Sequence, residues 1–166
     1  MTYYFVEGRI GAQQLAVVAD SAQHPLGTIL KATDPALGEG EFIYLKGAAS
    51  TVRGSAVIYN SADYTTTLTN ANAIGPVALA MGAIVANKYG WYQIGGKGVA
   101  KVAALFADNA NCYLTSSDGV IDDAVVAGDY IYNMKGAAAV GTPAANLAYV
   151  EMERPFVKDG LDDATT

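Results

Sequence analysis

The stretch YGWYQIGGKGVAKV, residues 89–102, decides the fold because it combines the chain's only tryptophan with three glycines clustered around a lysine. A glycine cluster of this kind either cradles a phosphate or turns a β-hairpin. The phosphate motif G-x-x-x-x-G-K-[ST] fails, since Trp91 stands at its first glycine and Gly98 at its hydroxyl residue. The dinucleotide motif G-x-G-x-x-G fails because Lys101 replaces its third glycine. We therefore predict two strands joined by a turn at residues 95–98, with Trp91 as a packing anchor.

The overall composition favours strands over helices. The 166 residues include 18 glycines and 11 tyrosines, 52% are hydrophobic, and only 16% are charged. Glycine suits tight turns, tyrosine is frequent in strands, and the length suits one domain with a sizeable core. Because a lightly charged surface protects poorly against association, we expect much of this surface to contact other protein.

The charge pattern argues against nucleic-acid binding, and the hydropathy pattern argues against membrane insertion. The formal net charge is −6 and the 10 lysines and arginines form no run, whereas nucleic-acid binding needs clustered basic residues. No apolar run approaches the roughly 20 residues that cross a bilayer, and the N-terminus lacks the features of a signal peptide. The single cysteine, Cys112, excludes an internal disulfide framework, fits synthesis in a reducing cytoplasm, and is expected to be buried.

Short runs of strand-forming residues alternate with turn residues along most of the chain. Their regular spacing predicts a mainly β fold, either a small antiparallel β-barrel or a sandwich, with an extended N-terminal arm. Strict alternation places Tyr130, Tyr132 and Met134 on one face of their strand. Pro155 is expected to close the last strand.

The chain divides into three parts. Residues 1–24 form the N-terminal arm, with an ordinary first strand and short helix of the core as the alternative. Residues 25–157 form the β-rich domain. Residues 158–166 form an acidic tail that is expected to be flexible.

No residue pattern supports catalysis, metal binding or a cofactor. His24 is the sole histidine, so it has no partner for a His/Cys metal site, and we expect it to be exposed or to cap a turn. The three aspartates Asp118, Asp122 and Asp123 lack the spacing of an EF-hand, and a solvated turn explains them better than calcium. The acidic residues that a glycosidase would pair are better explained as surface charge: Glu39, Glu41, Glu151 and Glu153.

Four phrases, taken in order, resemble the head decoration or capsid cement proteins of tailed bacteriophages. They are PLGTILKATDPALGEGEFIYLKGAAST at 25–51, GPVALAMGAIVANKYGWYQIGGKGVAKV at 75–102, DDAVVAGDYIYNMKG at 122–136 and ANLAYVEMERPFV at 145–157. The resemblance covers about residues 25–157 and rests on the order of these phrases, because the family has no catalytic signature.

The resemblance implies a structural virion protein on the outer surface of the phage capsid. Such a protein is made in the host cytoplasm, binds the assembled major capsid protein, is usually a homotrimer, and stabilises the head against the pressure of packaged DNA. It has no enzymatic activity and needs no cofactor. The family carries no residue-level signature that would transfer interaction residues to this chain.

Residues of the arm are the candidates for contact with the capsid or a neighbouring protomer. Aromatic and arginine side chains often anchor interfaces, and an extended arm can add a strand to a sheet edge. The candidates in the arm are Tyr3, Tyr4, Phe5 and Arg9.

Trp91 is a further candidate for the capsid or protomer interface, and packing in the core is the alternative for this side chain. A second class of function is a carbohydrate-binding or adhesin module on a virion or cell surface. In that case Tyr89, Trp91 and Tyr92 would form the aromatic platform.

Overall fold

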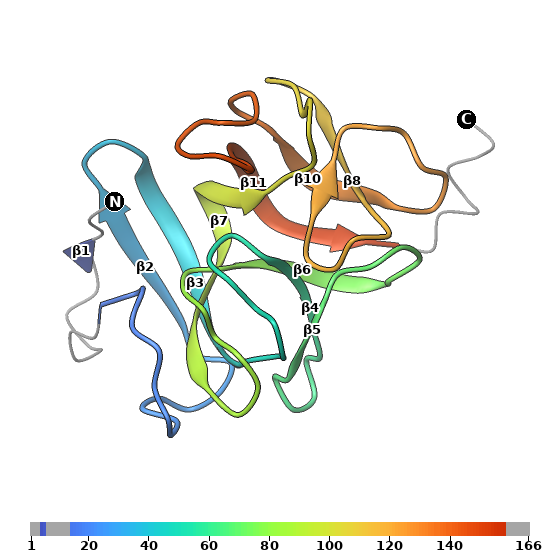
Figure 1. Cartoon of the computed structure of the whole chain (residues 1–166). Helices are drawn as coiled ribbons and strands as arrows, with labels where there is room; N and C mark the ends of the chain where they lie inside the picture. Colours follow the sequence, from blue (N-terminus) through green and yellow to red (C-terminus); the bar gives the residue numbers. More distant parts are fainter. Residues whose placement is uncertain (1–3, 6–13, 159–166) are drawn as a thin grey trace.

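The fold is built from β-strands within the part of the chain that the structure describes. A computed structural model describes residues 4–5 and 14–158 (Figure 1). Within these residues, eleven strands form one hydrogen-bonded sheet, which confirms the prediction of a mainly β fold. The strands are β1 (Tyr4–Phe5), β2 (Ile29–Asp34), β3 (Gly38–Lys46), β4 (Ala56–Tyr59), β5 (Thr66–Leu68), β6 (Gly75–Ala80), β7 (Tyr89–Lys101), β8 (Asn111–Leu114), β9 (Ile121–Asp122), β10 (Tyr130–Gly136) and β11 (Leu147–Val157).

Strand β7 is a single strand of 13 residues, so the predicted hairpin at residues 95–98 is wrong. Its first part pairs with β3 and β6, and its second part pairs with β11 from Gly95 onward. The glycines of this stretch allow the backbones of neighbouring strands to come close together. At Gly96 φ is +87°, and a Cβ there would lie 2.3 Å from the backbone oxygen of Glu39. A register shift against β3 at this place lets β7 change partners without turning back.

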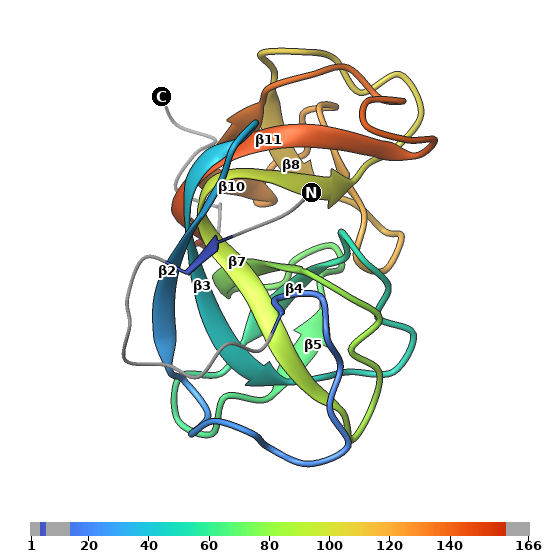
Figure 2. The ribbon, with the colours of Figure 1, turned by 90° about the vertical axis from the view of Figure 1, so that its left-hand side faces the viewer.

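Strand β7 belongs to two rings of strands. The first ring comprises β3, β7, β6, β4 and β5, and a parallel bridge between Lys46 and Thr65 closes it. The second ring comprises β7, β11, β10, β8 and β9, and a bridge between Val102 and Ile121 closes it. Figures 1 and 2 show the rings one above the other with β7 running through both. Pairing of β6 with β11 adds a second link between them.

Among the described residues, the core consists of three apolar clusters that follow this arrangement. One cluster fills the first ring and includes Ile43, Leu45 and Tyr92. A larger one fills the second ring, with contributions from all five of its strands. The third lies on the opposite face of β3 and β7, where β2 covers Phe42 and Trp91. Strands β3 and β7 therefore bury side chains on both faces, as runs of consecutive apolar residues indicate.

One register break between β10 and β11 overturns two expectations, the face assigned to Met134 and the end of the last strand at Pro155. Asn133 has φ +60°, and the register between β10 and β11 shifts beside it. Met134 is therefore buried in the core on the side of Ile131, and not on the face of the half-buried Tyr132. Strand β11 does not end at Pro155 but continues to Val157, because Arg154 adopts φ +46° and the chain resumes pairing beyond the proline.

The described residues at the N-terminus lie against the domain. Strand β1 pairs antiparallel with the edge strand β2, where Tyr4 faces Thr33 and Phe5 faces Ala32 in register. Within residues 14–24 no helix forms; Leu15 is buried in the third cluster, and Ala19 exchanges backbone hydrogen bonds with Tyr89. Tyr3, Arg9 and the tail beyond Lys158 lie outside the described residues.

Candidate interaction surface

The glycine cluster offers no cradle for a phosphate because it is part of a strand. Residues 95–101 pair along their length with β11. The buried amide of Gln93 donates hydrogen bonds to the backbone oxygens of Gly95 and Lys97, at 3.0 and 3.1 Å. The nitrogen of Lys97 lies 5.2 Å above the ring of Tyr149, which is a cation–π contact. The cluster thus holds strands together.

Trp91 is fully buried, so the hypothesis that it contacts the capsid or a protomer is corrected. Its ring packs against Tyr44 and His24, with centroid distances of 5.0 and 5.3 Å. Tyr92 is buried as well, and burial raises the pKa of its phenol to about 12. The aromatic platform proposed for a carbohydrate therefore does not exist, because only Tyr89 of its three members reaches the surface.

His24 was expected to be exposed or to cap a turn, but it belongs to an aromatic cluster. Its ring meets Tyr44 edge-on at 5.1 Å, and its Nε2 atom is buried without a hydrogen-bond partner among the described residues. The surrounding residues, SAQHPLG at 21–27, carry no local signal for this contact.

The acidic side chains considered for glycoside cleavage are on the surface, three of them in ion pairs. Arg154 donates to both carboxylate oxygens of Glu41, at 2.7 and 3.1 Å, across β11 and β3. The carboxylates of Glu39 and Glu151 pair with Lys31 and Lys135, respectively. Glu153 is exposed. Surface charge, as predicted, accounts for their positions.

Within residues 4–5 and 14–158, no three His, Cys, Asp or Glu side chains gather as metal ligands would. Asp118 accepts a hydrogen bond from Asn70, and Asp123 accepts one from the backbone of Ala107. Cys112 is buried as predicted, and burial together with Asp123 raises its pKa from 9.0 to about 12. In the same part of the chain, no helix is long and apolar enough to span a membrane.

A row of tyrosines on β8 and β10 is the aromatic surface that the sequence reasoning missed. The ring of Tyr130 contacts Tyr113 and Tyr132 with centroid distances of 5.4 and 4.8 Å, and all three are half-buried. The alternation of Tyr130 and Tyr132 was a visible signal for this row. Pairing with Tyr113 depends on the register between β8 and β10, which the sequence does not reveal.

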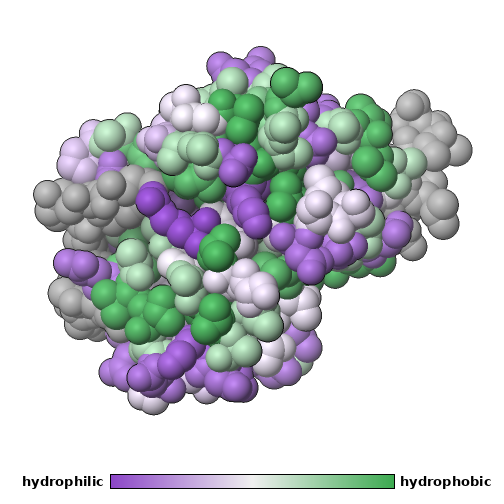
Figure 3. Space-filling view, in the orientation of Figure 1, coloured by the Kyte–Doolittle hydropathy of each residue, from purple (hydrophilic) through white to green (hydrophobic). Residues whose placement is uncertain are grey.

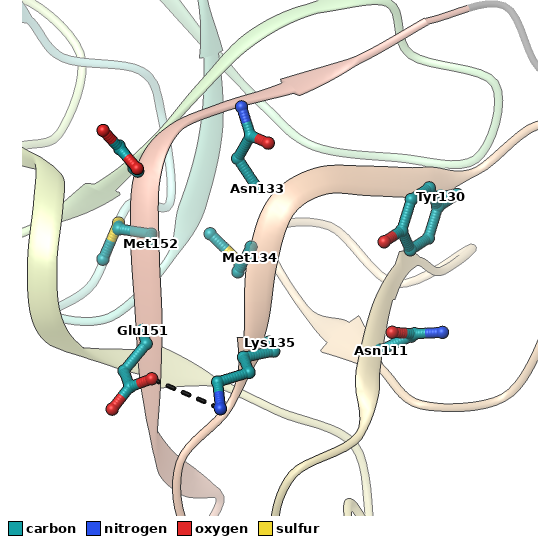
Figure 4. A pocket seen from close by; sticks show the side chains of 8 residues that line it. Asn111, Tyr130, Asn133, Met134, Lys135, Glu151 and Met152 are labelled. Atoms are coloured by element: carbon teal, nitrogen blue, oxygen red, sulfur yellow. Dashed lines mark ion pairs between the residues drawn. The ribbon is translucent and has the colours of Figure 1, made fainter.

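Two hollows flank this row and share Tyr130 and Asn111. The first has a volume of about 540 Å³ and lies over β10 and β11 (Figure 4). The second has a volume of about 430 Å³ and lies beside the loop from Val125 to Gly128. We call the two hollows together the tyrosine groove.

Several large apolar side chains are exposed near the ends of the strands. Leu105 is 89% exposed, Val125 is 81% exposed and Ile74 is 54% exposed. Figure 3 shows apolar residues in separate patches between polar ones on the face that it presents. Such residues on loops can contribute to protein contacts.

No protein-family model matches this chain, and no curated protein matches it significantly.

Proposed function

We propose that the protein is a structural virion component that binds the outer surface of an assembled phage capsid and cements it. The ordered resemblance of residues 25–157 to capsid decoration proteins supports this function. The partner is the major capsid protein, and the protein acts as a homotrimer. We further propose that it performs no enzymatic reaction and uses no cofactor.

The continuity of the sheet through both rings is the observation that carries the proposal. Strand β7 pairs with β3 and β6 in one ring and with β11 in the other. Because β7 is hydrogen-bonded in both rings, sliding one ring past the other would have to break whole rows of backbone hydrogen bonds at once. A cementing protein must keep its shape under the outward pressure on the head, and a sheet of this kind supplies the required stiffness.

The edge of β2 supports docking through the N-terminal arm. Strand β1 occupies that edge over two residues, Tyr4 and Phe5, and β2 itself extends over six. Strand addition supplies affinity through backbone hydrogen bonds, while side chains such as Tyr3 and Arg9 would add specificity. We propose that the arm pairs with a capsid subunit or with a neighbouring protomer when the protein is assembled.

The alternative of a carbohydrate-binding or adhesin module loses the platform on which it was based. Trp91 and Tyr92 are both buried beneath other strands. A cementing role depends on no such platform.

Co-sedimentation with undecorated phage heads tests the proposal. The intact chain should pellet with heads, and a variant that lacks residues 2–12 should pellet at least tenfold less, since it loses a strand and its aromatic anchors. A variant that lacks residues 159–166 is the matched control and should bind normally. Sedimentation equilibrium should give three times the 17.2 kDa chain mass. An intact chain that stays in the supernatant, or a stable monomer, would overturn the proposal.

A further inference from the structure

The tyrosine groove exists because β10 and β8 separate between two points of pairing. Tyr130 pairs with Tyr113 and Lys135 pairs with Asn111, with a register break between these pairs. Asn133 lies inside the break in the left-handed conformation. Asparagine tolerates this conformation better than most residues. Its polar amide therefore lies at the surface, whereas strict alternation from Ile131 would turn it into the core.

The bottom of the first hollow is apolar and its rim is polar. Met134 and Met152 face each other in register on β10 and β11. Figure 4 shows Met134 between the two strands and Met152 on the side of β11 away from β10, with Asn133 near one end and the Lys135–Glu151 ion pair near the other. An apolar floor with a few polar groups around it is the usual construction of a ligand site.

The aromatic side of the groove is held in place by its neighbours. Tyr113 and Tyr132 both contact the ring of Tyr130 edge-on or tilted, so that this ring is positioned before any ligand arrives. The ring of Tyr132 lies in turn under the nitrogen of Lys158, at 5.1 Å. A positioned ring reduces the entropy lost on binding.

The polar groups of the groove can both donate and accept hydrogen bonds. The side chains of Asn111 and Asn133 are exposed and make no hydrogen bond within the described residues. Each amide offers two donors and one acceptor oxygen. Glu151 shares its charge with Lys135 at 3.4 Å, whereas Glu153 has no ion-pair partner among the described residues. The first hollow therefore carries one uncompensated negative charge.

We propose that the tyrosine groove binds a neutral saccharide of one or two rings. A sugar ring presents C–H groups that pack on an aromatic ring or a thioether, and hydroxyls that pair with amides and carboxylates. The first hollow has a volume of about 540 Å³ and is wide open to solvent, so it suits a ligand that keeps one face in water. Its negative charge repels phosphorylated or acidic ligands. The saccharide lies over Met134 and Met152, beside Tyr130, and hydrogen-bonds with Asn133.

This inference does not rest on capsid binding, which was argued from β7 and the edge of β2. A chain that fails to bind capsids could still bind a saccharide, and the reverse also holds. The two experiments therefore fail independently.

Saturation-transfer difference NMR with defined disaccharides tests the inference. The probes are lactose, maltose, cellobiose and N,N′-diacetylchitobiose, with 3′-sialyllactose as the acidic comparison. At least one neutral probe should show transfer from the protein, and titration should then give its dissociation constant. The acidic probe should bind more weakly than lactose.

Two matched variants locate the site. Asn133→Gly removes the amide while keeping a residue suited to φ +60°, and Asn146→Gly makes the same change at another exposed asparagine with φ +60° outside the groove. Loss of a sugar hydrogen bond should weaken binding about tenfold in Asn133→Gly. The Asn146→Gly control should bind as the parent chain does, and both variants should keep the parent melting temperature within a few degrees.

Three results would overturn the proposal. The first is the absence of saturation transfer to any neutral probe at 10 mM (about the weakest binding worth calling specific). The second is an equal weakening of sugar binding in both variants. The third is displacement of the sugar by a hexapeptide of alternating glycine and lysine. The last result would assign the groove to a basic peptide, which its negative charge would attract.

Discussion

The two rings of strands share β7 but differ in the regularity of their pairing. In the first ring, β4 pairs with β5 and β6 without a register shift, and β3 pairs with β7 at seven positions with one shift. In the second ring, β10 shifts register against both of its neighbours, and Asn133 and Arg154 adopt left-handed conformations. Both rings nevertheless enclose a continuous apolar cluster.

This difference indicates that side chains are buried where strand pairing is regular and reach the surface where the register breaks. Regular segments of β3 and β7 keep four or more consecutive residues buried. The breaks in β10 and β11 bring Asn133 and Arg154 to the surface and create the tyrosine groove. We expect the first ring to contribute more to stability and the second to contain the groups available for recognition.

The largest expected effect comes from truncating one tyrosine in each ring. Tyr92→Ala empties a fully buried site inside the first ring and should lower the free energy of unfolding by about 4 kcal/mol. Tyr130→Ala removes a half-buried ring from the second and should lower it by about 1 kcal/mol. Urea denaturation measures both values. Equal losses would break the distinction between the two rings.

The next effect concerns the junction of the rings. Gly96→Ala combines an unfavourable φ with a clash against the backbone of Glu39, and should cost about 3 kcal/mol. Gly38→Ala is its matched control, because φ is +82° there but a Cβ meets nothing within 4 Å, so the cost should be about 1 kcal/mol. Chemical denaturation distinguishes the two. Similar costs would mean that strands do not crowd together at Gly96.

Cys112 tests whether the irregular second ring is closed to solvent. Burial raises the pKa of its thiol from 9.0 to about 12, so a disulfide reagent at pH 8 should label the unfolded chain and spare the native one. Because the thiol has a higher pKa in the folded chain than in the unfolded one, the stability that the buried neutral thiol contributes is complete below about pH 9. It is lost as the pH rises toward 12. Rapid native labelling at pH 8 would contradict the packing.

The smallest effect comes from the ion pair that joins β11 to β3. Arg154→Ala removes two hydrogen bonds to Glu41, but the arginine side chain is 62% exposed. The loss should be below about 1 kcal/mol and should shrink in about 1 M salt, because exposed charges are screened. Thermal denaturation at low and high salt measures it. A loss that is larger and independent of salt would show that the pair is a major link between the rings.

Most strands were predictable from the sequence because alternation and turn residues are local signals. The run around Phe42 and Tyr44 forms β3 with Ile43 on the opposite face, as alternation predicts. The burial of Cys112 was also predictable, since a lone cysteine behaves as a small apolar residue.

The errors share one physical cause, which is that long-range pairing decides what a glycine, asparagine or proline does. Residues 95–98 could turn a hairpin, but pairing with β11, and of Gly95 and Gly96 also with β3, keeps them within one strand. Asn133 and Pro155 lie at the same register break, which only the pairing of β10 with β11 defines. The tyrosine groove was missed for the same reason, because Tyr113 and Tyr130 are distant in the sequence.

Backbone NOEs around the glycine cluster test most directly the central claim that one strand serves both rings. We predict NOEs between Gly98 and Val150 and between Gly96 and Met152, which face each other in the register of β7 with β11. A hairpin turning at residues 95–98 would instead give backbone NOEs between Tyr92 and Lys101, and their observation would contradict the account.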